Sequence, residues 1–185
     1  MFTPMVVLIL VVAGGGFAWF TVRSIRSSGV QDGPVAYELA AVSTLRHLHT
    51  IQEHFRNNDA DGDGVKAYWR QDIAGLYTTP DKQGPLKLIE PTLAGADYLP
   101  KSDLTPYAKR ASKARYWYRA LRFSDEKDPD PKRFALCAFP DGTSNRARMT
   151  FIIAQDNLVY FKLLEKPETL VEYPADPGKE GWSRR

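Results

Sequence analysis

The chain changes its hydrophobic period once, and this change constrains the fold more than any other feature. From Val35 to Phe55, apolar residues recur at steps of three and four, the period of an amphipathic helix. The second half holds segments rich in aromatic and β-branched residues, at 114–123, 133–140, 148–154 and 158–164. A helix followed by strands predicts an α+β fold, in which a long amphipathic helix packs on an antiparallel β-meander.

Two shorter elements follow from the same patterns. Trp69, Ile73 and Leu76 share one side of a segment that predicts a second helix over residues 65–77. Residues 155–157, Gln-Asp-Asn, are few enough to join the last two strands as a hairpin.

Residues 1–22 contain no ionisable side chain, and an apolar helix of about 20 residues spans a bilayer core. Trp19 lies near the end of this run, where interfacial aromatic residues are common. No Lys or Arg precedes the run, which favours an uncleaved anchor over a signal peptide. The sequence therefore predicts a transmembrane anchor (or signal peptide) at 1–23, a polar linker at 24–33 and a globular domain at 34–185.

Composition limits the function classes. A hydrophobic content of 43% argues against wholesale disorder, and a net charge of +3 does not by itself indicate a nucleic-acid partner. The single cysteine, Cys137, cannot form an intrachain disulfide. Both faces of the strand that contains Cys137 are apolar, which predicts a buried, inert thiol.

Asp59, Asp61 and Asp63 stand at alternate positions and are followed by Gly64. In the calcium loop of an EF-hand, acidic ligands occupy positions 1, 3 and 5, glycine occupies position 6, and a backbone carbonyl serves at position 7. The three aspartates and the glycine fit these positions, and the carbonyl of Val65 could serve at position 7. Aspartate and glycine are also ordinary turn formers, so an acidic turn without an ion stays an open alternative.

The second half of this loop departs from the calcium pattern. Position 12, where an EF-hand has a bidentate Glu, is Arg70. Asp72, Asn57 or Asn58 could supply the missing oxygens. The three histidines, His47, His49 and His54, lie on the long helix without HExxH spacing, so they do not predict a zinc site.

Several segments together resemble a known family. STLRHLHTIQEHFRNNDADGDGVKAYWRQDIAGLY leads from a helix of the L-x-x-I-x-x-A-Q-x-x-F kind into an Asp/Asn-rich loop, a Trp and GLY. KARYWYRAL, FALCAFP and MTFIIAQDNLVYFK are similar to strand segments of the same group. Over residues 37–182 the chain resembles type IV pilins and type II secretion pseudopilins, and among these a group of uncharacterised pilin-like proteins of planctomycete-type bacteria.

The resemblance has one gap. Pilins carry a Gly-Phe-Thr-Leu-Ile-Glu type signature before the apolar run, whereas this chain begins MFTPMVVLIL and has no acidic residue before Asp32. The resemblance implies a domain in the periplasm or outside the cell, whereas Arg23 and Arg26 after the apolar run would keep the domain in the cytoplasm. We follow the resemblance and expect a single-pass membrane protein with an extracytoplasmic domain.

Two functions follow. The first is a non-enzymatic, membrane-anchored pilin- or pseudopilin-like domain that acts through protein contacts in or near a secretion or surface apparatus, without binding nucleic acid. The alternative is a calcium-dependent extracytoplasmic binding or sensing module that uses the Asp59, Asp61 and Asp63 loop. No nucleophile elbow, phosphate loop or dinucleotide fingerprint occurs, so the sequence predicts no enzyme and no catalytic residue.

Overall fold

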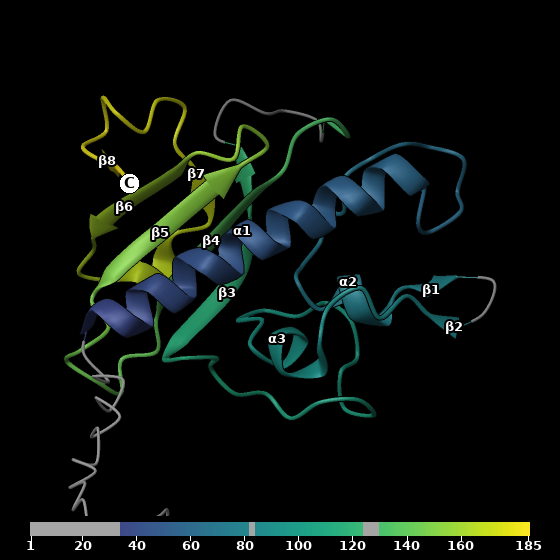
Figure 1. Ribbon diagram of the computed structural model, residues 1–185, viewed down its shortest axis with the longest axis horizontal. Helices are drawn as coiled ribbons and strands as arrows, with labels where there is room; N and C mark the ends of the chain where they lie inside the picture. The colour runs from purple at the N-terminus through teal and green to yellow at the C-terminus, as the bar shows by residue number, and fades with distance from the viewer. Residues whose placement is uncertain (1–33, 82–83, 124–129) are drawn as a thin grey trace, which may run out of the picture. The chain divides into compact units, whose positions relative to one another are not determined.

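The computed structural model describes residues 34–81, 84–123 and 130–185, and Figure 1 shows their arrangement. The helices are α1 (Pro34–Asn58), α2 (Gly75–Thr78), α3 (Pro91–Gly95) and the 3-10 helix η1 (Pro167–Thr169). The strands are β1 (Pro80–Asp81), β2 (Gly84–Pro85), β3 (Tyr116–Phe123), β4 (Ala135–Pro140), β5 (Met149–Ala154), β6 (Val159–Leu163), β7 (Glu172–Tyr173) and β8 (Ser183–Arg184).

The long helix α1 forms where the period of three and four predicts it. Its apolar stripe is buried through Ala41, Leu45, Leu48 and Phe55. The stripe packs on β4 and β5, which α1 crosses in Figure 1. Gln52 lies in the same stripe and is also fully buried, so one polar side chain stands among the apolar contacts of the helix.

The main sheet has six strands in the order β7-β3-β4-β5-β6-β8. The strands from β3 to β6 are consecutive antiparallel neighbours, and Asn157, with a φ of 60°, lies in the tight turn of the predicted hairpin between β5 and β6. At one end of the sheet β7 pairs with β3 in parallel, Arg122 opposite Glu172 and Phe123 opposite Tyr173. The sheet is therefore mixed.

Both faces of the central strands are covered, which explains why β4 and β5 are apolar without alternation. One face packs on α1, and the other packs under the C-terminal segment through Tyr173 and Trp182. Cys137 is fully buried on this second face, and burial raises the pKa of its thiol to about 12. The prediction of a buried cysteine is confirmed, and the inertness of its thiol stays a prediction.

The predicted pilin-like fold class is wrong. An antiparallel β-meander was expected on the helix, whereas the structure has one long helix and a curled, six-stranded mixed sheet. The error has a physical cause: β7 and β8 have two residues each, too few to show a period of two. Ring packing between Phe123 and Tyr173, with centroids 5.4 Å apart, accompanies the pairing of β7 with the end of β3.

The helix predicted over residues 65–77 is also wrong, because within this range only residues 75–77, the first three of α2, are helical. The backbone N–H of Trp69 donates to the side chain of Gln52, and the N–H groups of Ile73 and Ala74 donate to the side chain of Asp97. Side chains from distant parts of the chain thus take the donors that a helix would have used.

The expectation of a single-pass membrane protein is corrected as well. Within residues 34–81, 84–123 and 130–185, the structure has no helix with the length and apolarity that a bilayer crossing requires. The predicted anchor or signal peptide at 1–23 and the linker at 24–33 lie outside the described residues.

Candidate metal site

The acidic loop begins where α1 ends. Asp59, the first residue after the helix, has a φ of 49°, and the N–H of Ala60 donates to the carbonyl of Phe55 at 3.1 Å, which closes the last turn. Gly62 and Gly64 have φ values of 69° and 84°, which only glycine adopts without strain. The sequence DADGDG therefore places its two glycines where the backbone must curl around the carboxylates.

The loop brings the three predicted carboxylates together. One oxygen from each of Asp59, Asp61 and Asp63 lies within 4.8 Å of the other two. Asp59 Oδ2 accepts the N–H of Gly64 at 3.0 Å, and Asp63 Oδ1 accepts the N–H of Val65 at 2.7 Å. These hydrogen bonds fix the outer oxygens, so the cluster does not depend on an ion for its shape. The cluster could bind a metal ion.

Two oxygens of this cluster have no other partner. Asp59 Oδ1 and Asp61 Oδ1 are shielded from solvent and accept no hydrogen bond from any residue that the structure describes. Burial raises the pKa of the Asp61 carboxyl and the negative charges of Asp63 and Asp59 raise it further, whereas the backbone N–H groups of Asp61 and Asp63 oppose this rise. A cation between these carboxylates would remove the repulsion and supply the missing partner.

Both ends of the loop are fastened to the core. Gln52 clamps the chain after the loop: its Nε2 donates to the carbonyl of Trp69 at 2.6 Å, and its Oε1 accepts the N–H of Trp69 at 3.0 Å. The hydroxyl of Tyr68 donates to Glu53 Oε1 at 2.5 Å. The ring of Trp69 packs on Phe55, with centroids 5.9 Å apart. The loop thus spans two fixed points on α1 and is preorganised.

Of the other residues considered as ligands, Val65 keeps a free lone pair, whereas Arg70 and Asn58 make other contacts. Val65 follows the cluster, and its carbonyl accepts the N–H of Ala67 at 2.8 Å, which leaves a second lone pair on this oxygen. Arg70 Nη1 donates to the carbonyl of Asp130 at 2.8 Å, so position 12 supplies no acidic ligand. Asn58 Nδ2 donates to the carbonyl of His54.

Asp72 does not supply the missing oxygens. It is 2% exposed, and its carboxylate accepts five hydrogen bonds. The donors are Trp69 Nε1, the N–H of Gly75, the N–H of Lys101, and both the N–H and the hydroxyl of Ser102. Asp72 therefore ties α2 to the chain around residue 101.

Sequence analysis missed the roles of Gln52, Asp72 and Asp97, which fasten the region after the loop. Asp97 is 1% exposed and accepts the N–H groups of Ile73, Ala74 and Leu99. A glutamine inside an apolar helical stripe was the one available signal, because a buried amide requires polar partners. Nothing in the pattern identifies the distant partners, which lie 17 residues from Gln52, 23 and 24 from Asp97, and 29 and 30 from Asp72.

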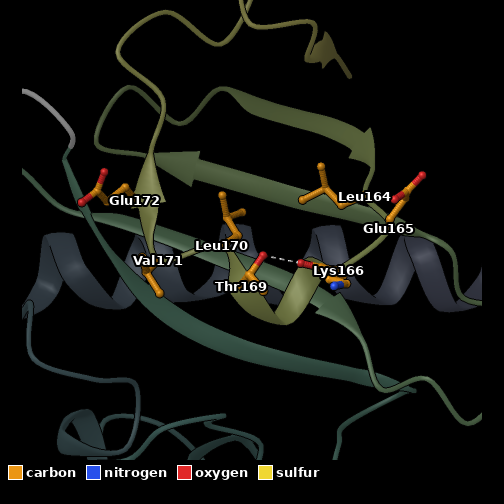
Figure 2. A pocket seen from close by; sticks show the side chains of 7 residues that line it. All are labelled: Leu164, Glu165, Lys166, Thr169, Leu170, Val171 and Glu172. Carbon is orange, nitrogen blue, oxygen red and sulfur yellow. Dashed lines mark hydrogen bonds between the residues drawn. The ribbon is translucent and has the colours of Figure 1, made fainter.

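A second surface feature of the described residues is a hollow beside the C-terminal segment. This hollow lies between the end of β6 and β7 and has a volume of about 490 Å³. Figure 2 shows the side chains that line it: Leu164, Glu165, Lys166, Thr169, Leu170, Val171 and Glu172. The hydroxyl of Thr169 donates to the carbonyl of Lys166 at 2.7 Å, so it is held by backbone rather than by a base. His49 Nε2 lies 3.2 Å from the carbonyl oxygen of Gln155, and the aspartate cluster is the one metal-competent group among the described residues.

Comparison of the chain with protein-family models, with curated proteins and with solved structures finds no match. Nothing therefore identifies a pilin or secretion family. The expected protein partners and the expected lack of nucleic-acid binding stay predictions.

Proposed function

We propose that this chain is a calcium-binding protein in which the loop of Asp59, Asp61, Asp63 and Val65 holds the ion. One observation carries the proposal: three carboxylates converge, and two of their oxygens are shielded and accept no hydrogen bond from a described residue. Calcium takes about 6–8 oxygen ligands and tolerates irregular geometry. The three carboxylates and the Val65 carbonyl would supply part of this set, and water the rest.

The chemistry of the donors favours calcium over other metals. Carboxylate and carbonyl oxygens suit hard cations, whereas zinc and copper favour imidazole and thiolate, which this cluster lacks. Magnesium requires near-ideal octahedral geometry and keeps most of its water. Backbone N–H groups already hold the carboxylates of Asp59 and Asp63, so this loop fits the irregular coordination of calcium better than the octahedron that magnesium requires.

The ion would act on structure rather than on a reaction. It would neutralise repulsion at the end of α1 and tie the helix to the chain that Gln52 and Glu53 hold. We infer a non-enzymatic binding module that calcium stabilises. A ligand that binds only the folded state stabilises it by about 2.7 kcal/mol at a concentration a hundredfold above its Kd.

The proposal is tested by thermal unfolding of the full chain and of Asp61→Asn/Asp63→Asn, each with calcium and with chelator. Without calcium the variant should be at least as stable as the wild type, because two repelling charges are gone. With calcium the wild type should have the higher melting temperature of the two. Asp103→Asn/Asp156→Asn is the control, because those exposed aspartates also accept an N–H two residues ahead. If the same protein is the more stable one both with calcium and with chelator, the loop is an acidic turn that binds no ion.

A further inference from the structure

Positive charge is concentrated in one stretch of the chain. Residues 101–122 contain seven basic residues and one acid, whereas the whole chain carries a net charge of +3. Of these basic residues, Arg119 is buried and the other six are exposed or half-buried: Lys101, Lys109, Arg110, Lys113, Arg115 and Arg122. Lys113 pairs with Glu90, and Arg122 lies 4.0 Å from Glu172. Lys101 and Lys109 make no ion pair with any described residue.

A hollow of about 510 Å³ lies within this stretch. Pro100, Leu104 and Ala108 provide apolar lining, Lys109 and Arg110 provide positive charge, and Asp103 adds one carboxylate. Leu99, next in the chain to Pro100, is 59% exposed. The hollow therefore offers room for an apolar side chain beside the ammonium group of Lys109 and the guanidinium of Arg110.

Arg110 and the aromatic rings near it are already held in place. Arg110 Nη2 donates to the carbonyl of Tyr98 at 2.6 Å, and its guanidinium lies over the ring of Trp117 at 5.6 Å. Arg119 lies over the ring of Tyr98 at 4.7 Å, and Phe139 packs edge-on against that ring. Binding of single-stranded nucleic acid requires aromatic faces on which bases stack, and these faces are occupied.

We propose that this basic surface, formed by Lys101, Lys109, Arg110 and the hollow, binds an acidic peptide segment of a partner protein. The carboxylates of the peptide pair with Lys101 and Lys109, for which the described residues offer no ion-pair partner, and one apolar side chain enters the hollow. Charge complementarity selects the peptide and speeds its encounter, and the apolar contact fixes its register. The surface shares no residue with the aspartate loop, so the inference does not depend on calcium binding.

Fluorescence anisotropy tests the proposal, with the full chain in calcium-free buffer because acidic peptides bind calcium themselves. The probes are a labelled peptide of Glu and Asp with one central Leu, its Gln and Asn counterpart, and an oligothymidine of equal length. The acidic peptide should bind, and binding should weaken as salt rises. The neutral peptide and the oligothymidine should bind at least about tenfold more weakly.

Two variants of equal charge locate the surface. Lys101→Glu/Lys109→Glu should weaken binding of the acidic peptide about tenfold or more. Lys132→Glu/Lys166→Glu reverses two exposed lysines elsewhere and should leave binding within about twofold after the same change in net charge. Equal loss in both variants, equal binding of the neutral peptide, or equal binding of oligothymidine would overturn the proposal. All four side chains are exposed, so the folds of both variants should survive, which circular dichroism checks.

Discussion

Gln52 and Trp69 exchange two hydrogen bonds between a side-chain amide and a backbone peptide group, at 2.6 and 3.0 Å. The amide pairs with the backbone N–H and the backbone carbonyl of Trp69, as a neighbouring β-strand would. Because Gln52 is fully buried, this contact both fastens the chain after the acidic loop and satisfies a polar group inside the core.

Replacement of Gln52 by Leu should lower the free energy of unfolding by about 2–4 kcal/mol, because the N–H and the carbonyl of Trp69 lose their partner in a buried place. Urea unfolding measures the change. Gln71→Leu makes the same substitution at an exposed position and should stay within about 0.5 kcal/mol of the wild type. Equal effects of the two variants would show that the clamp does not stabilise the fold.

Gly75→Ala should destabilise the protein by about 1–3 kcal/mol, because the added methyl group would overlap the indole ring of Trp69. The ring cannot move easily, since Trp69 Nε1 donates to Asp72 and the backbone is held by Gln52. Gly178→Ala is the control, because its methyl group would meet Asp176 at an ordinary 3.5 Å. Denaturant midpoints of both variants that equal the wild-type midpoint would contradict this packing.

The turn before β3 is built from unfavourable residues. Ala114 and Arg115 have φ values of 50° and 66°, and Lys113 and Tyr116 exchange hydrogen bonds at 2.9 and 3.0 Å around them. Positive φ at both central residues defines a turn that prefers Asn-Gly. Ala114→Asn/Arg115→Gly should therefore raise the melting temperature and add about 1–2 kcal/mol of stability. A lower melting temperature would show that the contacts of the Arg115 side chain stabilise the fold by more than its positive φ destabilises it.

Asp97 should make stability depend on pH. Burial raises the pKa of its carboxyl to about 6, the charge of Asp72 adds to this, and the N–H donors Ala74, Ile73 and Leu99 oppose it. Because the pKa is higher in the folded state, the protonated carboxyl favours folding. This contribution is complete below about pH 3.8 and is lost as the pH rises through about 6.

The rise in the pKa of Asp97 from 3.8 to about 6 corresponds to about 3 kcal/mol of folding free energy. Urea unfolding from about pH 4 to pH 7 measures it as the difference between the wild type and Asp97→Asn, whose side chain does not titrate. This difference should change with pH in favour of the variant as the pH rises. A difference that is constant across this range would show that Asp97 keeps its ordinary pKa.

The sequence predicted what depends on local periodicity. The stripe from Ala41 to Phe55 identified α1, and the four apolar segments identified β3 to β6, because each is long enough to show its period. The loop of Asp59, Asp61 and Asp63 was also recognisable, because its carboxylates are neighbours in the chain.

The rest depends on contacts that no local pattern encodes. Residues 65–77 look helical until the distant side chains of Gln52 and Asp97 take their backbone donors. The parallel pairing of β7 depends on contacts between residues 49 to 51 positions apart, such as those of Arg119 with the carbonyls of Glu168 and Leu170. Local sequence patterns therefore could not predict the mixed sheet.

Calcium titration calorimetry on the full chain tests the central claim most directly. The wild type should release or absorb heat with a stoichiometry of about one ion per chain, because the three carboxylates form one cluster. The heat should vanish in Asp61→Asn/Asp63→Asn and persist in Asp103→Asn/Asp156→Asn. Absence of heat in the wild type, or heat that persists in the first variant, would contradict the assignment of a calcium site to this loop.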